Sequence, residues 1–261
     1  MSAPGLAGMP LVLGLCAGLA LAVGVWLRSL ARRDVSIVDV AWSWLVWVPA
    51  AVATAASGTT GSRALPLLVL SLAWALRLSL HLLQRQHGQP EDPRYQAIRA
   101  RNEPHFAWKS LYLVFALQAL LGWVVGWPLH AAATGAAPWQ PLDLAGVGLM
   151  AFGLGFEAVA DAQLARFRRE PANRGRVMAQ GLWRYTRHPN YFGECCLWWG
   201  AWLLAAAAGA WWTVASPLLM TWLLLRVSGV ALLEQDIGER RPGYADYVRR
   251  TNAFVPGRPR P

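Results

Sequence analysis

The chain has 261 residues, of which 56% are hydrophobic and only 15% are charged, and its formal net charge is +10. Soluble domains carry about 25% charged residues, so the composition excludes an ordinary soluble enzyme and favours a polytopic membrane protein. The positive charge does not indicate a nucleic-acid partner, because the basic residues lie in short loops between apolar segments. The three cysteines all lie within apolar runs without Cys/His ligand spacing, so neither a disulfide framework nor a metal site is expected.

Seven apolar segments are long enough, or nearly so, to cross a bilayer as helices, since one span needs about 20 apolar residues. In chain order they are residues 9–28, 36–56, 64–84, 109–130, 142–164, 191–208 and 211–233. No internal repeat or linker divides them, so we expect one all-α domain over residues 1–261. The N-terminus lacks the basic region of a signal peptide, so the first segment is expected to remain as a span.

The basic residues are distributed unequally between the two sides of this predicted bundle. All but three of the 24 Lys and Arg lie in the loops 28–34, 85–109 and 165–190 or in the tail after residue 233, which alternate along the chain. Because cytoplasmic loops are rich in Lys and Arg, this pattern predicts a polytopic protein with its N-terminus outside and its C-terminus in the cytoplasm.

Ionisable residues inside the spans are candidates for function, because a charge within a bilayer is costly unless it is paired or binds something. These residues are Asp39, Arg77, His81, Glu157, Asp161, Glu194, Arg226 and Glu234. All of them fall in the cytoplasmic halves or ends of the predicted spans, so we expect a polar cavity open to the cytoplasm. Glu157 and Asp161 share one helix face, where two carboxylates repel each other unless donors or a cation satisfy both. A packing role for His81, and snorkelling of Arg226 and Glu234 to the interface, remain alternatives.

A dense polar motif, Gly181-Leu-Trp-Arg-Tyr-Thr-Arg-His-Pro-Asn-Tyr-Phe-Gly-Glu194, precedes the sixth span. The loop before it is rich in arginine, whose guanidinium group binds phosphates in a bidentate manner. The chain has no glycine-rich nucleotide loop, so a phosphorylated cofactor would have to be held by the helices themselves. Contact with anionic lipid headgroups is the alternative, which we favour for Arg166, Arg169 and Arg174.

This motif resembles the steroid 5α-reductase family, in its bacterial and poorly characterised branch. The resemblance extends over most of the chain, through Ser36-Ile-Val-Asp-Val-Ala-Trp42, Glu91-Asp-Pro-Arg-Tyr95, Glu157 to Asp161 and Tyr244-Ala-Asp-Tyr-Val-Arg-Arg-Thr-Asn-Ala-Phe-Val-Pro256. It implies a seven-helix membrane enzyme that uses NADPH to reduce a carbon–carbon double bond conjugated to a ketone. The implied partners are a lipophilic, steroid-like or other lipid substrate and the lipids of a bacterial inner membrane. No obligate protein partner is evident.

The resemblance also assigns roles to individual residues. Contacts with NADPH are implied for Arg77, Glu157, Asp161, Arg168, Arg176, Tyr185, Arg187, His188, Asn190, Tyr191, Glu194, Trp198, Arg226 and Glu234. Asp39 lies near the family's catalytic carboxyl, which works with a tyrosine on the third span, where this chain has Trp74. An indole can donate a hydrogen bond but cannot give a proton. To hydrogen-bond a ketone as an acid, Asp39 would have to be protonated.

The element Arg187-His188-Pro189 with Tyr191 also resembles the isoprenylcysteine and phospholipid methyltransferases. Those enzymes bind S-adenosylmethionine through this element and an acidic residue on the last helix, a pattern that Glu234 followed by two tyrosines would fit. The additional spans before residue 140 and the segment Asn190–Glu194 favour the reductase. A transporter or scaffold is a third class, but transporters place binding groups near the midplane with access from both sides.

Overall fold

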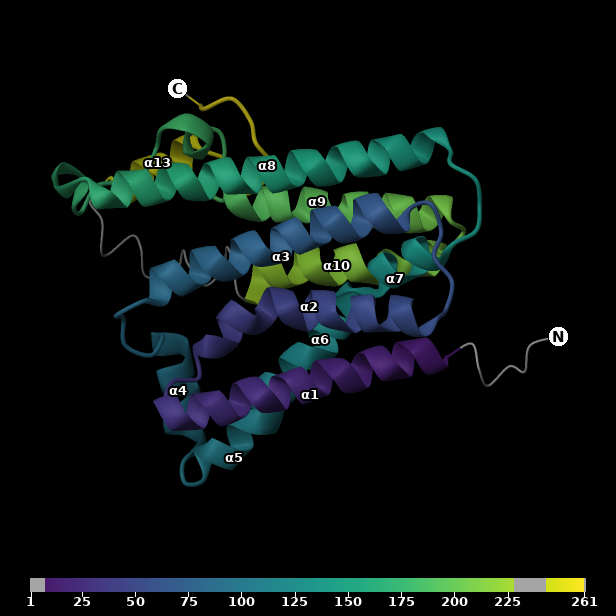
Figure 1. The fold of residues 1–261 in the computed structure, drawn as a ribbon. Helices are drawn as coiled ribbons and strands as arrows, with labels where there is room; N and C mark the ends of the chain where they lie inside the picture. The colour runs from purple at the N-terminus through teal and green to yellow at the C-terminus, as the bar shows by residue number, and fades with distance from the viewer. Residues whose placement is uncertain (1–7, 228–242, 261) are drawn as a thin grey trace. The chain divides into compact units, whose positions relative to one another are not determined.

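The computed structural model describes residues 8–227 and 243–260, and every regular element within these ranges is helical (Figure 1). The α-helices are α1 Met9–Arg32, α2 Ile37–Ala56, α3 Ala64–Gln86, α4 Pro93–Asn102, α5 Phe106–Ser110, α6 Leu117–Val125, α7 Trp127–Thr134, α8 Pro141–Arg169, α9 Pro189–Ala207, α10 Ala215–Trp222 and α13 Tyr244–Arg250. The π-helices η1 (Leu111–Ala116) and η5 (Leu223–Val227) and the 3-10 helices η2 (Pro171–Asn173), η3 (Gly181–Arg184) and η4 (Trp211–Val214) complete the set. The all-α class is therefore confirmed.

Five of the described helical stretches are long and apolar enough to cross a membrane: Met9–Arg32, Ile37–Ala56, Ala64–Gln86, Phe106–Thr134 and Pro141–Arg169. They confirm the first five predicted spans as helices and correct their bounds. The fourth is longer than predicted and consists of α5, η1, α6 and α7, because Gly126 and Pro128 mark a break between α6 and α7. The helix α9 covers the sixth predicted span, but its tryptophans and polar residues leave it outside this apolar set. The seventh is helical to Val227, and the rest of it lies outside the described residues.

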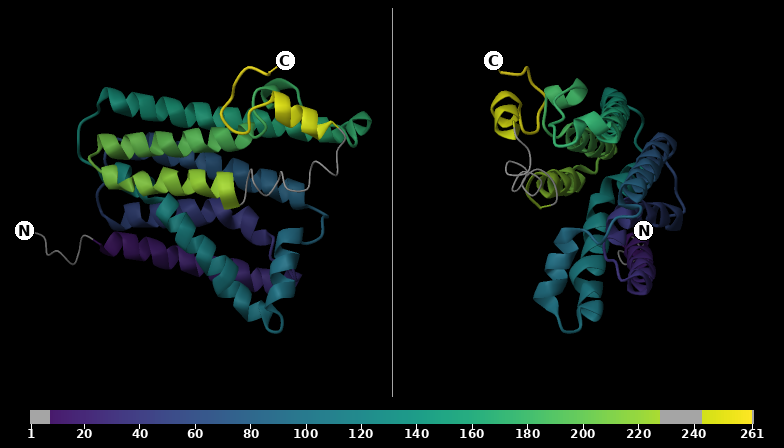
Figure 2. Two further views of the ribbon diagram at one scale, coloured as in Figure 1. Left: turned by 180° about the vertical axis from the view of Figure 1, so that it is seen from behind. Right: turned by 90° about the vertical axis from the view of Figure 1, so that its left-hand side faces the viewer.

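The chain divides into two compact units, which we describe separately. The first unit comprises Met1–Gln140 with Leu204–Ser216, and the second comprises Pro141–Leu203 with Pro217–Pro261. Figure 2 shows the helices of both units from two further sides.

In the first unit, α2 packs between α1 and α6 through two pairs of glycines. Each pair has the G-x-x-x-G spacing that lets membrane helices approach closely, one pair beginning at Gly14 in α1 and the other at Gly122 in α6. A Cβ on Gly14 would lie 2.5 Å from the carbonyl oxygen of Pro49, and one on Gly122 would lie 2.7 Å from that of Leu45. The backbones of three helices therefore touch without side chains between them.

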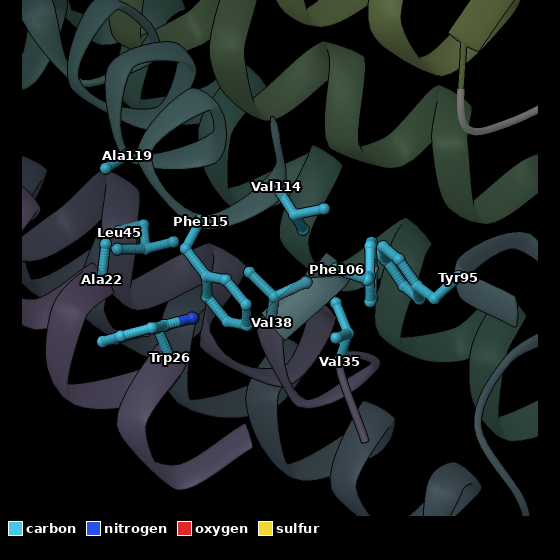
Figure 3. Packing of buried hydrophobic residues seen from close by; sticks show 10 residues of the cluster. All are labelled: Ala22, Trp26, Val35, Val38, Leu45, Tyr95, Phe106, Val114, Phe115 and Ala119. Carbon is cyan, nitrogen blue, oxygen red and sulfur yellow. The ribbon is translucent and has the colours of Figure 1, made fainter. Parts of the chain in front are cut away.

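An apolar cluster joins the ends of α1, α2 and α6 to the hairpin formed by α4 and α5 (Figure 3). Trp26 lies at its base and donates its indole N–H to the carbonyl of Ala107 at 2.9 Å. Phe106 and Tyr95 pack on the opposite side and are 1% and 6% exposed. This packing fixes α4, which carries Tyr95, against the start of α2.

In the second unit, α8 and α9 run side by side with their backbones in contact (Figure 1). Glycines seven residues apart, or about two turns, lie on the facing surfaces of both helices. A Cβ on Gly200 would lie 2.7 Å from the oxygen of Gly146, and one on Gly193 would lie 2.7 Å from the amide nitrogen of Glu157. The order of these contacts makes the pair antiparallel and brings the polar end of α8 to the start of α9.

Candidate functional site

Two buried carboxylates of α8 lie against the first turn of α9. Glu157 and Asp161 are 2% and 5% exposed, and the Nδ2 of Asn190 donates a hydrogen bond to Oδ1 of Asp161 at 3.1 Å. The orientation of the Asn190 amide follows from the chemistry, since its oxygen would repel a carboxylate oxygen. The sequence predicted the shared face of the two carboxylates, and the structure adds Asn190 as a donor to one of them.

The other end of the Asn190 amide provides an unused acceptor. Its Oδ1 is buried, and no described residue donates a hydrogen bond to it. A buried acceptor left unsatisfied costs free energy. A ligand that carries an amide or hydroxyl donor would satisfy it, as the carboxamide and ribose hydroxyls of a nicotinamide nucleotide would. The donors and acceptors present at this junction therefore fit such a cofactor.

The segment before α9 presents further predicted site residues. His188 is 5% exposed, and its ring is parallel to that of Tyr191 with 5.6 Å between the ring centroids. Glu194 and Trp198 are buried one and two turns beyond Asn190 on the same helix face. Tyr185, by contrast, is 43% exposed. The structure thus brings one group of predicted site residues together in α8, in α9 and in the loop that connects them. These residues are Glu157, Asp161, His188, Asn190, Tyr191, Glu194 and Trp198.

The other predicted cofactor contacts lie at the edge of this junction or elsewhere. Arg168, in the last turn of α8, and Arg176, in the following loop, are exposed, as a contact with a charged phosphate tail would require. Arg187 is half-buried, and its Nη1 donates to the carbonyl of Thr251 at 2.6 Å. Arg226 is exposed in η5. Glu234 lies outside the described residues.

In the first unit, the carboxylate of Asp39 is held by two donors from α4. Its Oδ2 accepts from Nη2 of Arg94 at 2.7 Å, and its Oδ1 accepts from the hydroxyl of Tyr95 at 2.5 Å. The helix α4 begins at Pro93 because the side chain of Asp92 caps it by accepting a hydrogen bond from the amide of Arg94. Asp92 also pairs with the Arg94 guanidinium, and Gln118 donates to the Tyr95 oxygen at 3.3 Å. One arginine therefore links the cap of α4 to the first turn of α2.

In this network both carboxylate oxygens of Asp39 accept hydrogen bonds, and the O–H that is donated belongs to Tyr95. The arrangement therefore offers Tyr95, and not Asp39, as the group with a proton to donate. The sequence did not identify Tyr95 as a partner of Asp39. The glycine and proline residues of the loop before Tyr95 indicate an ordered turn. They do not show which span this turn contacts. Trp74, the predicted partner, is completely buried in α3, and Arg77 lies half-buried one turn further along the same helix.

The acidity of Tyr95 gives a prediction for stability at high pH. Burial, followed by the charge and hydrogen bond of Asp39, raises the pKa of Tyr95 well above its ordinary value of 10. The neutral phenol therefore contributes stability that is fully present below pH 10 and is lost as the pH rises through the folded-state pKa. We expect the thermal unfolding midpoint of the wild type to fall more steeply above about pH 10 than that of Tyr95→Phe. Parallel curves for the two proteins in a detergent thermal-shift series would contradict this assignment.

A groove on the first unit, between α2 and α3, has a cavity volume of about 330 Å³. Trp47 forms one wall and donates its indole N–H to the carbonyl of Leu68 at 3.4 Å. No charged or hydrogen-bonding side chain other than this indole lines it, so it offers nothing that would orient a phosphate or a ketone. Its lining residues are Trp47, Ala64, Leu65, Leu68, Val69 and Leu72.

The predicted ionisable residues thus divide between the two units. Asp39, Arg77 and His81 belong to the first, and Glu157, Asp161, Glu194 and Arg226 belong to the second. Within residues 8–227 and 243–260, no group of His, Cys, Asp and Glu side chains is arranged to hold a metal ion.

Comparison with known proteins gives one family. No curated protein and no solved structure matches the chain. The profile of a family described as "Protein of unknown function (DUF1295)" matches residues 25–251, which include both Asp39 and the α8–α9 junction. Because this match covers most of the sequence, the chain belongs to the DUF1295 family.

Proposed function

We propose that this protein is a membrane-embedded, NADPH-dependent reductase of a carbon–carbon double bond conjugated to a ketone in a lipophilic substrate. The observation that carries the proposal is the α8–α9 junction, where the buried Oδ1 of Asn190 lacks a donor among the described residues beside two buried carboxylates. The exposed Arg168 and Arg176 beyond it suit the phosphates of the same ligand. The resemblance to the steroid 5α-reductases supplies the chemistry.

The residues of the second unit bind and orient the cofactor in this proposal. NADPH, when bound, supplies a hydride for the β-carbon of the enone. Asn190 would accept a hydrogen bond from the cofactor, and Asp161 keeps the Asn190 amide in the orientation that this requires. Arg168 and Arg176 would bind the phosphates of the cofactor. The other cofactor contacts that the resemblance implies, including those from Arg77, Tyr185, Arg226 and Glu234, are predictions of the same proposal.

Tyr95 replaces Asp39 as the proposed acid. Its hydroxyl now donates to Asp39 at 2.5 Å, and in the reaction the same proton is directed to the ketone oxygen, where negative charge develops. Asp39 then acts by orienting the phenol, and Arg94 holds the Asp39 carboxylate in place through its hydrogen bond. Trp74 has no proton-transfer role in this version, since an indole N–H gives no proton.

We further propose that the chain has seven spans, with its N-terminus outside and its C-terminus in the cytoplasm of a bacterial inner membrane. Five of these seven spans correspond to apolar helices long enough to cross a membrane. The 19 residues of α9 measure about 28 Å along the helix axis, nearly the thickness of a bilayer core, and α10 begins a seventh. The arginines in alternate loops support this orientation.

The substitution Asn190→Ala tests the cofactor site. It removes both the acceptor for the ligand and the donor to Asp161, so we expect NADPH affinity, measured by calorimetry on the detergent-purified protein, to fall at least about tenfold. The matched control is Asn102→Ala, because Asn102 donates only to the carbonyl of Ile98 at 2.8 Å, at the end of α4 and away from the proposed cofactor contacts. Wild-type affinity in Asn190→Ala would refute the role of this residue.

A further inference from the structure

The segment between η3 and α9, residues 185–188, is not helical, so its backbone groups need partners from elsewhere. The C-terminal segment, residues 243–257, provides them. The amide of Arg187 donates to the carbonyl of Asn252 at 2.9 Å, and the amide of Gly257 donates to the carbonyl of Tyr185 at 2.9 Å. Thr186 and Asn252 form a parallel bridge. The end of the chain is therefore paired with the residues that lead into the proposed cofactor site.

Thr186 connects this pairing to His188 through one buried hydroxyl. Its side chain is completely buried, and its Oγ1 donates to the carbonyl of Phe254 at 2.7 Å. The same oxygen accepts from the amide of His188 at 3.3 Å. His188 is two residues before Asn190, so a shift of the C-terminal segment would be transmitted directly to the start of α9.

Tyr247 and Arg187 fix the helix α13 to the same segment. The hydroxyl of Tyr247 is buried and donates to the carbonyl of Trp183 at 2.5 Å. The Nη1 of Arg187 donates to the carbonyls of Val248 and Thr251, at the C-terminal end of α13. Basic side chains commonly satisfy the last carbonyls of a helix in this way. This use of Arg187 is distinct from the NADPH contact that the resemblance implies.

An aromatic contact extends the attachment to both helices of the junction. Phe254 packs edge-on against Phe192 of α9, with ring centroids 5.9 Å apart, and Phe192 packs against Phe156 of α8 at 5.6 Å. The C-terminal segment thus contacts the loop by hydrogen bonds and α9 by an aromatic ring.

We propose that residues 243–257 position the start of α9 for ligand binding, with Thr186 and Tyr247 as positioning residues that do not themselves touch the ligand. The effect on NADPH rests on the proposed function, whereas the ordering of residues 185–190 does not. The structural reason is that the Thr186 hydroxyl joins the loop to the carbonyl of Phe254 in the C-terminal segment, and the Tyr247 hydroxyl joins that segment to the carbonyl of Trp183 in η3.

The test compares Thr186→Val with Thr186→Ser in the full-length protein. Valine has nearly the same shape as threonine but lacks the hydroxyl, whereas serine keeps it. We expect Thr186→Val to accelerate hydrogen exchange at the amides of Arg187 and His188 and to weaken NADPH binding by about tenfold, and Thr186→Ser to restore both. Thr213→Val is the matched control, because Thr213 is also completely buried but donates only to the carbonyl of Ala210.

Each outcome decides the proposal. Unchanged exchange in Thr186→Val, faster exchange with unchanged affinity, or no rescue by serine would overturn it. If the wild type binds no NADPH, the proposed function fails, and the exchange data alone decide whether the C-terminal segment orders the loop. If Thr186→Val does not fold, Tyr247→Phe replaces it, since this variant removes the bond to Trp183 and a longer contact with Thr186 while keeping the aromatic ring.

Discussion

Replacing Tyr95 by phenylalanine is expected to lower the turnover of a conjugated enone by about 10²- to 10⁴-fold, the usual contribution of a general acid. The phenol is the only proton donor other than Arg94 that contacts Asp39 among the described residues, at 2.5 Å. Because the ring remains, packing around residue 95 is preserved, and NADPH affinity should change by less than about twofold. The measurement is NADPH oxidation with a Δ4-3-ketosteroid as the probe substrate.

The control for this variant is Tyr112→Phe. Tyr112 lies in η1 of the same unit, and its side chain is 60% exposed, so its hydroxyl should not affect turnover. Wild-type turnover in Tyr95→Phe would eliminate Tyr95 as the acid, whereas an equal loss in both variants would point to general damage to the first unit.

The substitution Gly153→Val should have the largest effect on stability. A Cβ on Gly153 would overlap the backbone oxygen of Gly193, with the amide of Leu197 only 2.5 Å away, so neither neighbour can move without separating α8 from α9. Overpacking of this kind costs about 3 kcal/mol or more, which corresponds to a decrease of about 10 °C in the unfolding midpoint. Separation of the helices would also disrupt the bond between Asn190 and Asp161.

Gly155→Val, on the same helix, is the matched control. No atom lies within 4 Å of a Cβ built on Gly155, so valine there should leave the unfolding midpoint nearly unchanged. If the two variants unfold at the same temperature in detergent, the close packing of α8 and α9 is not what holds the junction together.

Hydropathy was sufficient to predict most of the fold. The first three spans and the fifth begin within one residue of the observed helices, because long apolar runs leave little choice of structure. Hydropathy did not indicate the π-turns of η1 or the break before α7, since these depend on local backbone geometry. Hydropathy also did not explain the glycines that allow α8 and α9 to pack closely. Their role is recognisable only from the contacts between the two folded helices.

The candidate site was predicted less completely. Glu157 and Asp161 follow from helix periodicity, and Asn190 follows from the resemblance, but their meeting depends on the packing of two helices. The pairing of Asp39 with Tyr95 joins residues 56 positions apart through a loop, and no periodic pattern encodes such a contact. The same holds for Thr186 and Phe254, which are 68 positions apart.

The central claim is that the protein binds a nicotinamide dinucleotide, and calorimetry with the detergent-purified protein tests it most directly. We expect NADPH to bind, with weaker binding in Asn190→Ala, and S-adenosylmethionine to give no heat of binding. Binding of S-adenosylmethionine without NADPH would contradict the account, assign the Arg187-His188-Pro189 element to a methyltransferase, and remove the catalytic role proposed for Tyr95 and Asp39.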